Sequence, residues 1–365
     1  MRIVTRYLLR EFLGPLAACF VSFNAIFVLF DLFGHLSRFL DADLPLRLVF
    51  RYYAGVVSYY SAWFIPASCM LATLYTMWRL SHHSEITAMR ASGISFHRLT
   101  LPFFSVALAM AVLSFANSQW LAPEAAEWSD RLKDAAFRPE ERTTRQNHLF
   151  MNARSRRTWV FGGIDGTSPV SFAHTTNSVR VTHDTAGVND WGVRADGADW
   201  LDGTWWLKNP RIVFFDIDGE ELPPGAAAQP ALPADMPFPE FEETPRDMFL
   251  ATRSWDHLGA TDLARRIFMQ GRDDPEKKFD FWYRIAAPWA CLVITLFSIP
   301  AGITTGRQSV FKGVVLALGT FFGFYALTLL LEFCGQHGYV PAAPAAWIPN
   351  LAFLAIGLFL YRRLT

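Results

Sequence analysis

A short polar segment, residues 84–95, lies between two long apolar runs and carries the residue types best suited to an interaction. Ser84 can cap a helix whose first turn holds Glu85, a charge that is favourable at the positive end of the helix dipole. Gly93 can end that helix in the left-handed conformation, which glycine adopts at low cost. The spacing predicts a helix of two turns between the two long apolar runs.

Three side chains of this helix fall on one side, because Ile86, Met89 and Arg90 follow one another at i, i+3 and i+4. They offer two apolar anchors and a charge to a protein partner. The same pattern suits a helix that lies on lipid headgroups, so the residues alone leave both interpretations open.

Motifs for catalysis are missing from the sequence. The nearest glycine-rich stretch, residues 302–307, lacks the lysine and the preceding strand of a phosphate-binding loop. The sequence contains neither HExxH nor GxSxG. His82 and His83 would diverge by about 100° on a helix, and the four cysteines have no CxxC spacing. We therefore expect no ATP hydrolysis, no metal site, no cofactor and no enzymatic activity in this chain.

Polar and aromatic residues inside apolar runs form a second group of candidates. Arg284 and Glu332 are costly within lipid, so they are functional candidates unless they pair with each other or reach the membrane surface. Phe321, Phe324 and Tyr325 supply bulky apolar surface suited to acyl chains, although such residues also pack against neighbouring helices.

The composition indicates a membrane protein that carries a polar insertion. Hydrophobic residues make up 52% of the 365 positions, with 33 Phe and 13 Trp. The formal net charge is zero, yet residues 122–280 hold 27 acidic and 19 basic residues, a balance of −8, which leaves +8 for the remainder. Because the basic residues lie beside apolar runs, a nucleic-acid partner is not expected.

Six apolar runs are candidate transmembrane spans, since a helix of about 20 residues crosses a hydrocarbon core of about 30 Å. They are residues 12–33, 50–78, 100–121, 284–303, 313–334 and 346–361. Basic residues near span ends are retained in the cytoplasm, and they concentrate on one face: Arg2, Arg6, Arg10, Arg79, Arg90, Arg98, Arg307, Lys312, Arg362 and Arg363. Both termini should be cytoplasmic, and the insertion at 122–280 should lie on the outside, which in a bacterial inner membrane is the periplasm.

The insertion has the pattern of a β domain. Short β-prone runs occur at 158–161, 170–172, 178–181 and 211–215, and the turn-forming pairs Asp-Gly stand at 165–166, 196–197, 202–203 and 218–219. These strands predict a sandwich or jelly roll. A helix is expected at 123–137, an extended proline-rich linker at 223–239, and a returning helix at 256–270.

Several short motifs resemble one family. EITAMRASGIS at 85–95, WLAP at 120–123, GYVP at 338–341 and WIPN at 347–350 resemble the YjgP/YjgQ (LptF/LptG) permeases of the lipopolysaccharide exporter, and the resemblance covers nearly the whole chain. It implies an α-helical bacterial inner-membrane protein of six transmembrane helices, three plus three, with an inserted periplasmic β-jellyroll domain. The corresponding boundaries are 1–121, 122–280 and 281–365.

The resemblance also implies partners. They are a paralogous permease subunit, a cytoplasmic ABC ATPase dimer that binds the ATP, a periplasmic bridge protein and lipopolysaccharide, which enters between spans one and five. The residues expected to couple to the ATPase are Glu85, Ile86, Met89, Arg90 and Gly93.

In that family, basic residues at the outer end of span one meet substrate phosphates. The matching neighbourhood here offers only His35 and Arg38, where a lysine cluster can occur. Arg38 can pair with an anionic headgroup or extend to the membrane surface. The expected substrate-binding residues are His35, Arg38, Phe321, Phe324 and Tyr325.

The sequence thus predicts a permease subunit that extracts lipopolysaccharide from the inner membrane and passes it to a periplasmic bridge, powered by a separate ATPase. One alternative is a membrane-anchored periplasmic binding or sensor module. Another is an integral membrane enzyme acting on lipid, with His35, Arg284 and Glu332 as its polar centre. The residues do not distinguish the two permease paralogues or the saccharide form of the substrate.

Overall fold

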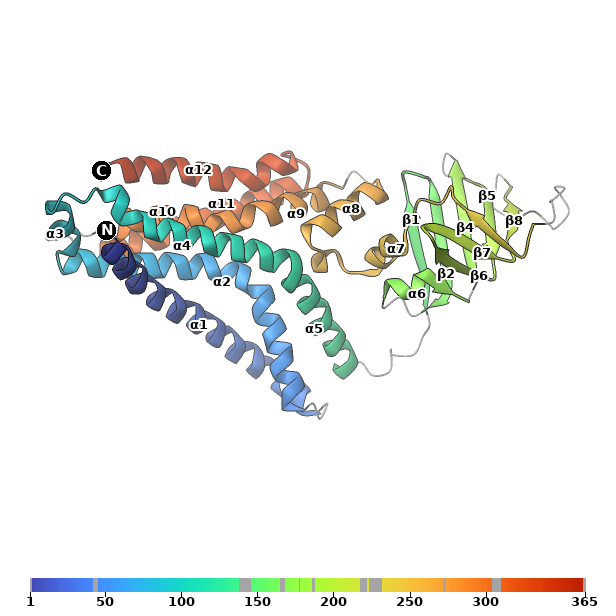
Figure 1. The fold of residues 1–365 in the computed structure, drawn as a ribbon, viewed down its shortest axis with the longest axis horizontal. Coiled ribbons are helices and arrows are strands. Elements are labelled where there is room, and N and C mark those ends of the chain that lie inside the picture. Colours follow the sequence, from blue (N-terminus) through green and yellow to red (C-terminus); the bar gives the residue numbers. More distant parts are fainter. Residues whose placement is uncertain are drawn as a thin grey trace. The chain divides into compact units, whose positions relative to one another are not determined.

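The computed structural model describes residues 2–41, 45–137, 146–164, 168–176, 178–185, 188–216, 222, 232–271, 274–303 and 310–363. The chain forms two compact units (Figure 1). Met1–Phe137 and Asp274–Thr365 form a helical unit, and Arg138–Asp273 form a β unit. The prediction of a helical protein with an inserted β domain is therefore confirmed.

The helical unit consists of long helices joined by short connections. Its elements are α1 (Arg2–Asp41), α2 (Leu46–His82), α3 (Glu85–Ala91), α4 (Phe96–Ala116), the π-helical turn η1 (Asn117–Leu121), α5 (Ala122–Phe137), α9 (Pro275–Ala286), the 3₁₀ turn η4 (Ala287–Trp289), α10 (Ala290–Gly302), α11 (Val310–Gln336) and α12 (Ala342–Arg362). Helix α5 confirms the helix expected at 123–137, and it follows α4 and η1 without an intervening loop.

Five helical stretches are long and apolar enough to cross a membrane: Ile3–Asp41, Phe96–Ser129, Pro275–Gly302, Leu318–Gln336 and Ala342–Arg362. They correspond to five of the six predicted spans. The remaining one, at 50–78, lies in α2, which is not among the candidate spans of the described chain. Tyrosine and serine are interleaved with the apolar residues of α2, as at Ser58–Ser61, and they lower its hydropathy.

Helices α2 and α10 pack closely against each other in the helical unit. A Cβ added to Gly302 would lie 2.6 Å from the Met77 Cβ and 3.0 Å from the Leu74 carbonyl oxygen. Glycine at this position therefore allows the two backbones to approach, as small residues do in membrane helices. The core beside this contact includes Phe12, Cys69, Phe103 and Ile299.

The β unit contains two antiparallel sheets (Figure 1). The first has the strand order β1-β2-β4-β5-β8, formed by β1 (Gln146–Asn152), β2 (Arg157–Ile164), β4 (Val179–Thr185), β5 (Val188–Ala195) and β8 (Arg211–Phe214). The second has the order β3-β6-β7-β9, formed by β3 (His174–Thr175), β6 (Gly197–Leu201), β7 (Thr204–Lys208) and β9 (Asp235–Phe238).

One apolar core joins the two sheets. On β2, Trp159 and Phe161 are fully buried, because alternate side chains of a strand point to the same face. On β7 of the other sheet, Trp205 and Leu207 are also fully buried, and the ring centroids of Trp159 and Trp205 are 5.1 Å apart. The two sheets therefore pack face to face.

Three of the four predicted strand segments are confirmed, in β2, β4 and β8. The prediction of a strand at 170–172 is wrong, because these residues belong to a short helix, α6 (Pro169–Ala173). The Ser168 hydroxyl accepts a hydrogen bond from the Ser171 amide at 3.4 Å. Pro169 stands in the first turn, where its missing N–H leaves no helix bond unmade.

The predicted turns and linker have different outcomes. Asp202 and Gly203 form a tight hairpin between β6 and β7, with φ of 50° and 79°. The pair at 196–197 instead leads from one sheet to the other. The pairs at 165–166 and 218–219 lie outside the described residues, as do 223–231 of the linker. The linker prediction is wrong for Asp235–Phe238, which form β9 because they pair with β7.

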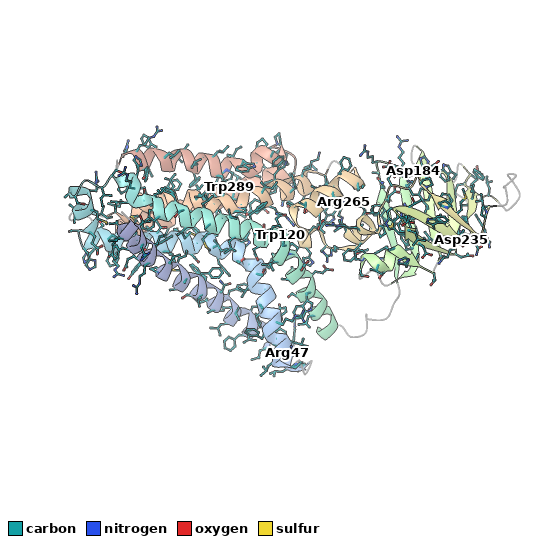
Figure 2. The ribbon with its side chains drawn as sticks, viewed as in Figure 1. Arg47, Trp120, Asp184, Asp235, Arg265 and Trp289 are labelled. Atoms are coloured by element: carbon teal, nitrogen blue, oxygen red, sulfur yellow. The ribbon has the colours of Figure 1, made fainter. Side chains whose placement is uncertain are left out.

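Two helices complete the β unit, α7 (Pro245–Thr252) and α8 (Ala260–Gln270). A 3₁₀ turn, η3 (Trp255–His257), lies between them. The helix expected at 256–270 is thus confirmed from residue 260 onward. Arg265 of α8, labelled in Figure 2, forms an ion pair with Asp247 of α7. The hydrogen bond from Arg265 to this carboxylate raises the pKa of the guanidinium, and the pair fastens α7 to α8.

Candidate functional site

The polar segment after α2 folds as predicted into a short helix, but its start differs. Ser84 has a φ of 55°, and its side chain makes no capping hydrogen bond. Its backbone carbonyl instead accepts the first helical bond, from the Ala88 amide at 3.0 Å. The predicted side-chain cap is therefore wrong. Gly93 has a φ of 87°, which confirms the predicted left-handed end.

Helix α3 is anchored to its own chain through its apolar residues. Ile86 is buried in the core of the helical unit, and Met89 packs against the same core. The Tyr7 hydroxyl donates a hydrogen bond to Glu85 Oε2 at 2.8 Å, and Arg90 lies over the Phe96 ring at 5.9 Å. Ile86, which the sequence offered as an anchor for a partner, is buried and instead holds this short helix against the bundle.

The exposed side of α3 consists of other residues. Thr87, Ala88, Arg90 and Ala91 are exposed. Three of these four side chains are small, and the fourth, Arg90, carries a positive charge. A neighbouring ion pair, Arg79 Nη1 to Glu11 Oε2 at 2.7 Å, ties α2 to α1.

The residues at the end of α1 make contacts with their own helix and with α2. His35 Nδ1 lies 2.9 Å from the carbonyl oxygen of Asp31, and the Tyr53 hydroxyl donates to Asp31 Oδ2 at 3.0 Å. Arg38 is exposed, one turn beyond His35. The structure therefore leaves Arg38, more than His35, accessible to a headgroup.

The three aromatic candidates of α11 face the interior of the helical unit. Phe324 is 5% exposed, and Phe321 and Tyr325 are half-buried against the same cluster. The ring of Tyr325 stacks on Trp63 of α2 at 5.7 Å. The exposed side of α11 carries instead Val315, Phe322, Leu329 and Phe333. Their predicted contact with acyl chains stays a prediction.

The two ionisable candidates lie on different helices. Arg284 is half-buried on α9. Glu332, on α11, accepts a hydrogen bond from Gln336 at 3.3 Å, one turn further along the same helix. His35, the third member of the alternative polar centre, is on α1. Within the described ranges, no group of three His, Cys, Asp or Glu side chains could hold a metal ion.

Sequence reasoning missed a polar contact between helices. Asn117, in η1, accepts a hydrogen bond from the Ser58 hydroxyl at 2.7 Å and donates to the Ser61 hydroxyl at 2.9 Å. The available signal was an asparagine at the end of an apolar run, where a polar side chain needs a partner. The contact ties the middle of α2 to the junction of α4 and α5.

The surface of the helical unit is strongly apolar. Phe30 is 76% exposed, Phe33 and Trp120 are each 72% exposed, and Phe322 is 66% exposed. Trp120 follows α4, and Trp289, also exposed, stands in η4 (Figure 2). Soluble proteins rarely expose apolar surface on this scale. The fold therefore defines a multi-pass helical membrane protein with an inserted domain of two antiparallel sheets.

Comparison with known proteins gives the family. Residues 6–363 match the family described as "Lipopolysaccharide export system permease LptF/LptG". The chain is 22% identical over 375 residues to the LptF permease protein of Escherichia coli (strain K12), covering 98% of this chain and 94% of the relative. It is 21% identical over 318 residues to the LptG permease protein of the same strain, covering 82% and 81%. The chain belongs to the LptF/LptG family.

Membership of this family confirms the resemblance found in the sequence motifs. The chain is a permease of the lipopolysaccharide export system and not itself an enzyme. The system to which it belongs implies ABC transporter partners.

Proposed function

We propose that this permease subunit extracts lipopolysaccharide from the bacterial inner membrane and passes it to a periplasmic bridge protein, powered by a cytoplasmic ABC ATPase dimer that binds the ATP. A paralogous permease completes the membrane part. The observation that carries the proposal is the construction of α3. Its apolar side is anchored in the bundle by Ile86, and its small residues face outward. A helix that sits in a groove of a partner and transmits the partner's motion needs both features.

The proposed topology has six spans, namely the five candidate spans and α2, and both termini lie in the cytoplasm. Helix α2 has 37 residues, more than the roughly 20 that cross a hydrocarbon core. The β unit, a jelly roll in this proposal, then lies in the periplasm. The proposed domains are 1–121, with the coupling helix, 122–280 and 281–365. Support comes from the basic residues near α3 and both termini.

Cysteine labelling tests this topology with a matched pair of substitutions. Ser254, between α7 and η3, and Ser92, after α3, are both exposed. In a background without the four native cysteines, Ser254→Cys should react in whole cells, whose inner membrane is intact, with a reagent that crosses only the outer membrane. Ser92→Cys should react only after inner-membrane lysis. The reverse pattern would invert the topology.

The proposed substrate contact at the membrane surface is Arg38. A hydrogen bond to a charged group is typically worth about 1.5–3 kcal/mol when it is desolvated, whereas an exposed ion pair contributes about 0–1 kcal/mol. The exposed position of Arg38 near the end of α1 supports this role. His35, engaged with Asp31, would shape the same end of the helix.

Charge reversal at Arg38 should reduce photocrosslinking of lipopolysaccharide to α1 by about fivefold or more and impair export. The reason is that loss of a desolvated contact worth about 1.5 kcal/mol lowers the affinity by about tenfold. Arg47, exposed at the start of α2 and labelled in Figure 2, provides the control. Arg47→Glu makes the same charge change and should have a smaller effect. Equal crosslinking in wild type and Arg38→Glu would assign Arg38 to the membrane surface only.

Acyl chains are proposed to lie along α11. The predicted residues Phe321, Phe324 and Tyr325 face inward here, so they could contact a chain only after α11 moves. The exposed residues Phe322 and Leu329 offer apolar surface without such a movement. We therefore propose that α11 contacts the lipid first through its exposed side.

A further inference from the structure

A small pocket lies between helices of the helical unit, on the inner side of α11. Its volume is about 60 Å³. Helices α2, α9, α10, α11 and α12 all contribute to its wall, with Trp63, Tyr283 and Thr328 among the larger side chains. Most of the wall is apolar, so a polar group that faces this space is a specific feature.

Of the polar side chains in this wall, Asn350 of α12 is the one with a buried atom that has no hydrogen-bond partner among the described residues. Its side chain is 94% buried, since only 6% of the residue is exposed, and it lines the cavity. Its Nδ2 donates a hydrogen bond to the Ala286 carbonyl at 2.8 Å. Ala286 ends α9, where the 3₁₀ turn η4 begins. Among the residues that the structure describes, its Oδ1 has no hydrogen-bond partner.

Proline adds a second acceptor to the same wall. Pro66 lies inside α2 and lines the cavity together with Ala62, one turn earlier. Because proline has no N–H, the carbonyl of Ala62 loses the helical donor that it would otherwise have. Pro349, beside Asn350, also lines the cavity. The wall therefore holds one buried acceptor without a partner, Asn350 Oδ1, and one residue, Ala62, whose carbonyl lacks its usual helical donor.

The volume decides which donor fits. One buried water needs a cavity of at least about 10–15 Å³, and its share of liquid volume is about 30 Å³. An apolar cavity of about 150 Å³ stays dry and takes benzene. The space here, at about 60 Å³, is much smaller, and an acyl chain has no donor to offer to Asn350 Oδ1. It has room for about two to four waters.

We propose that this cavity is a binding site for a small cluster of water molecules, which donate hydrogen bonds to Asn350 Oδ1 and to the Ala62 carbonyl. The waters complete the hydrogen bonding of Asn350 and fill the space between α11, α2 and α12. The site is independent of the transport step proposed above.

A double-mutant cycle tests the site in the full chain, reconstituted in lipid nanodiscs, with the midpoint of thermal unfolding as the measurement. Asn350→Leu keeps the branched shape of the side chain and removes both polar atoms. This change should lower the midpoint by a few degrees, because it removes both the hydrogen bond to the Ala286 carbonyl and the bonds from the waters. Ala346→Val, which adds two methyl groups to the cavity wall, should displace water and lower the midpoint in the wild-type background.

The two changes should be coupled. In the Asn350→Leu background, Ala346→Val should lower the midpoint less than in the wild-type background, because only the Ala62 carbonyl is then left without water. An equal effect of Ala346→Val in both backgrounds would overturn the proposal. A rise of the midpoint for Asn350→Leu alone would also overturn it, because a dry cavity gains when an unsatisfied polar atom is removed.

A map of the wild-type permease at a resolution that shows waters gives an answer that does not depend on how the variants fold. The expected result is density for at least one water within hydrogen-bond distance of Asn350 Oδ1. An empty cavity, or continuous density from an acyl chain, would overturn the proposal.

Discussion

Replacing Ala88 by glutamate should abolish copurification of the cytoplasmic ATPase with this permease and leave the permease itself folded. Ala88 is exposed and lies on the side of α3 opposite the buried Ile86. If α3 seats in a groove of the ATPase, a long charged side chain at this position cannot be accommodated without desolvation. Loss of an interface hot spot costs at least about 2 kcal/mol, so recovery of the ATPase should fall by at least about 30-fold.

The controls for this experiment separate coupling from folding. Ala88→Ser preserves the size and exposure of the position and should retain the ATPase. Ile86→Ala truncates a buried side chain and should lower the free energy of unfolding of the permease by about 2–5 kcal/mol. Met89→Asp combines both effects, because Met89 packs partly against the core. Normal ATPase binding and lipid export by the Ala88→Glu protein would remove α3 from the coupling interface.

Replacing Glu243 by leucine should destabilise the β unit by about 3–5 kcal/mol, because breaking a buried ion pair leaves its partner uncompensated. Glu243 is fully buried. Its Oε1 accepts hydrogen bonds from Asn152 at 2.8 Å, from the Ser155 hydroxyl at 2.6 Å and from Arg157 Nε at 3.0 Å. Leucine would deprive these three donors of their common acceptor at the end of the β1–β2 hairpin.

Hydrogen exchange of the reconstituted permease measures this effect separately from the helices. Peptides from β1 and β2 should exchange faster in Glu243→Leu, while peptides from α10 should not change. Glu242 is exposed and adjacent in the chain. Its replacement by leucine should stay within about 0.5 kcal/mol of wild type, as surface changes do. Unchanged protection of β1 and β2 in Glu243→Leu would contradict the assigned role of this carboxylate.

Local patterns predicted the elements whose causes are local. The left-handed end of α3 follows from Gly93, and the β6–β7 hairpin follows from Asp202 and Gly203. The strand predicted at 170–172 failed because β propensity was weighed without the cap at Ser168 and the proline after it. These two residues are also a local signal, so the sequence contained the information that the propensities obscured.

The candidate site could be predicted only in part. Residues 85–95 were found because their order is characteristic and their helix is delimited by its own residues. Asn117 was missed as a contact, since its partners Ser58 and Ser61 lie almost 60 positions earlier in the chain. Asn350 was recognised only as part of a motif, because the cavity that it lines is built from five different helices.

The sequence by itself determined the class of this protein and its family. Long apolar helices and a polar β insertion follow from hydrophobicity and turn chemistry, which act over short distances along the chain. Only the tertiary structure decided which side of each helix is accessible. Ile86 and Phe324 face inward, whereas Ala88 and Phe322 face outward. In α11 nearly every side chain is apolar, so no polar stripe marks the outer side, and the contacts with α2, α10 and α12 select the buried one.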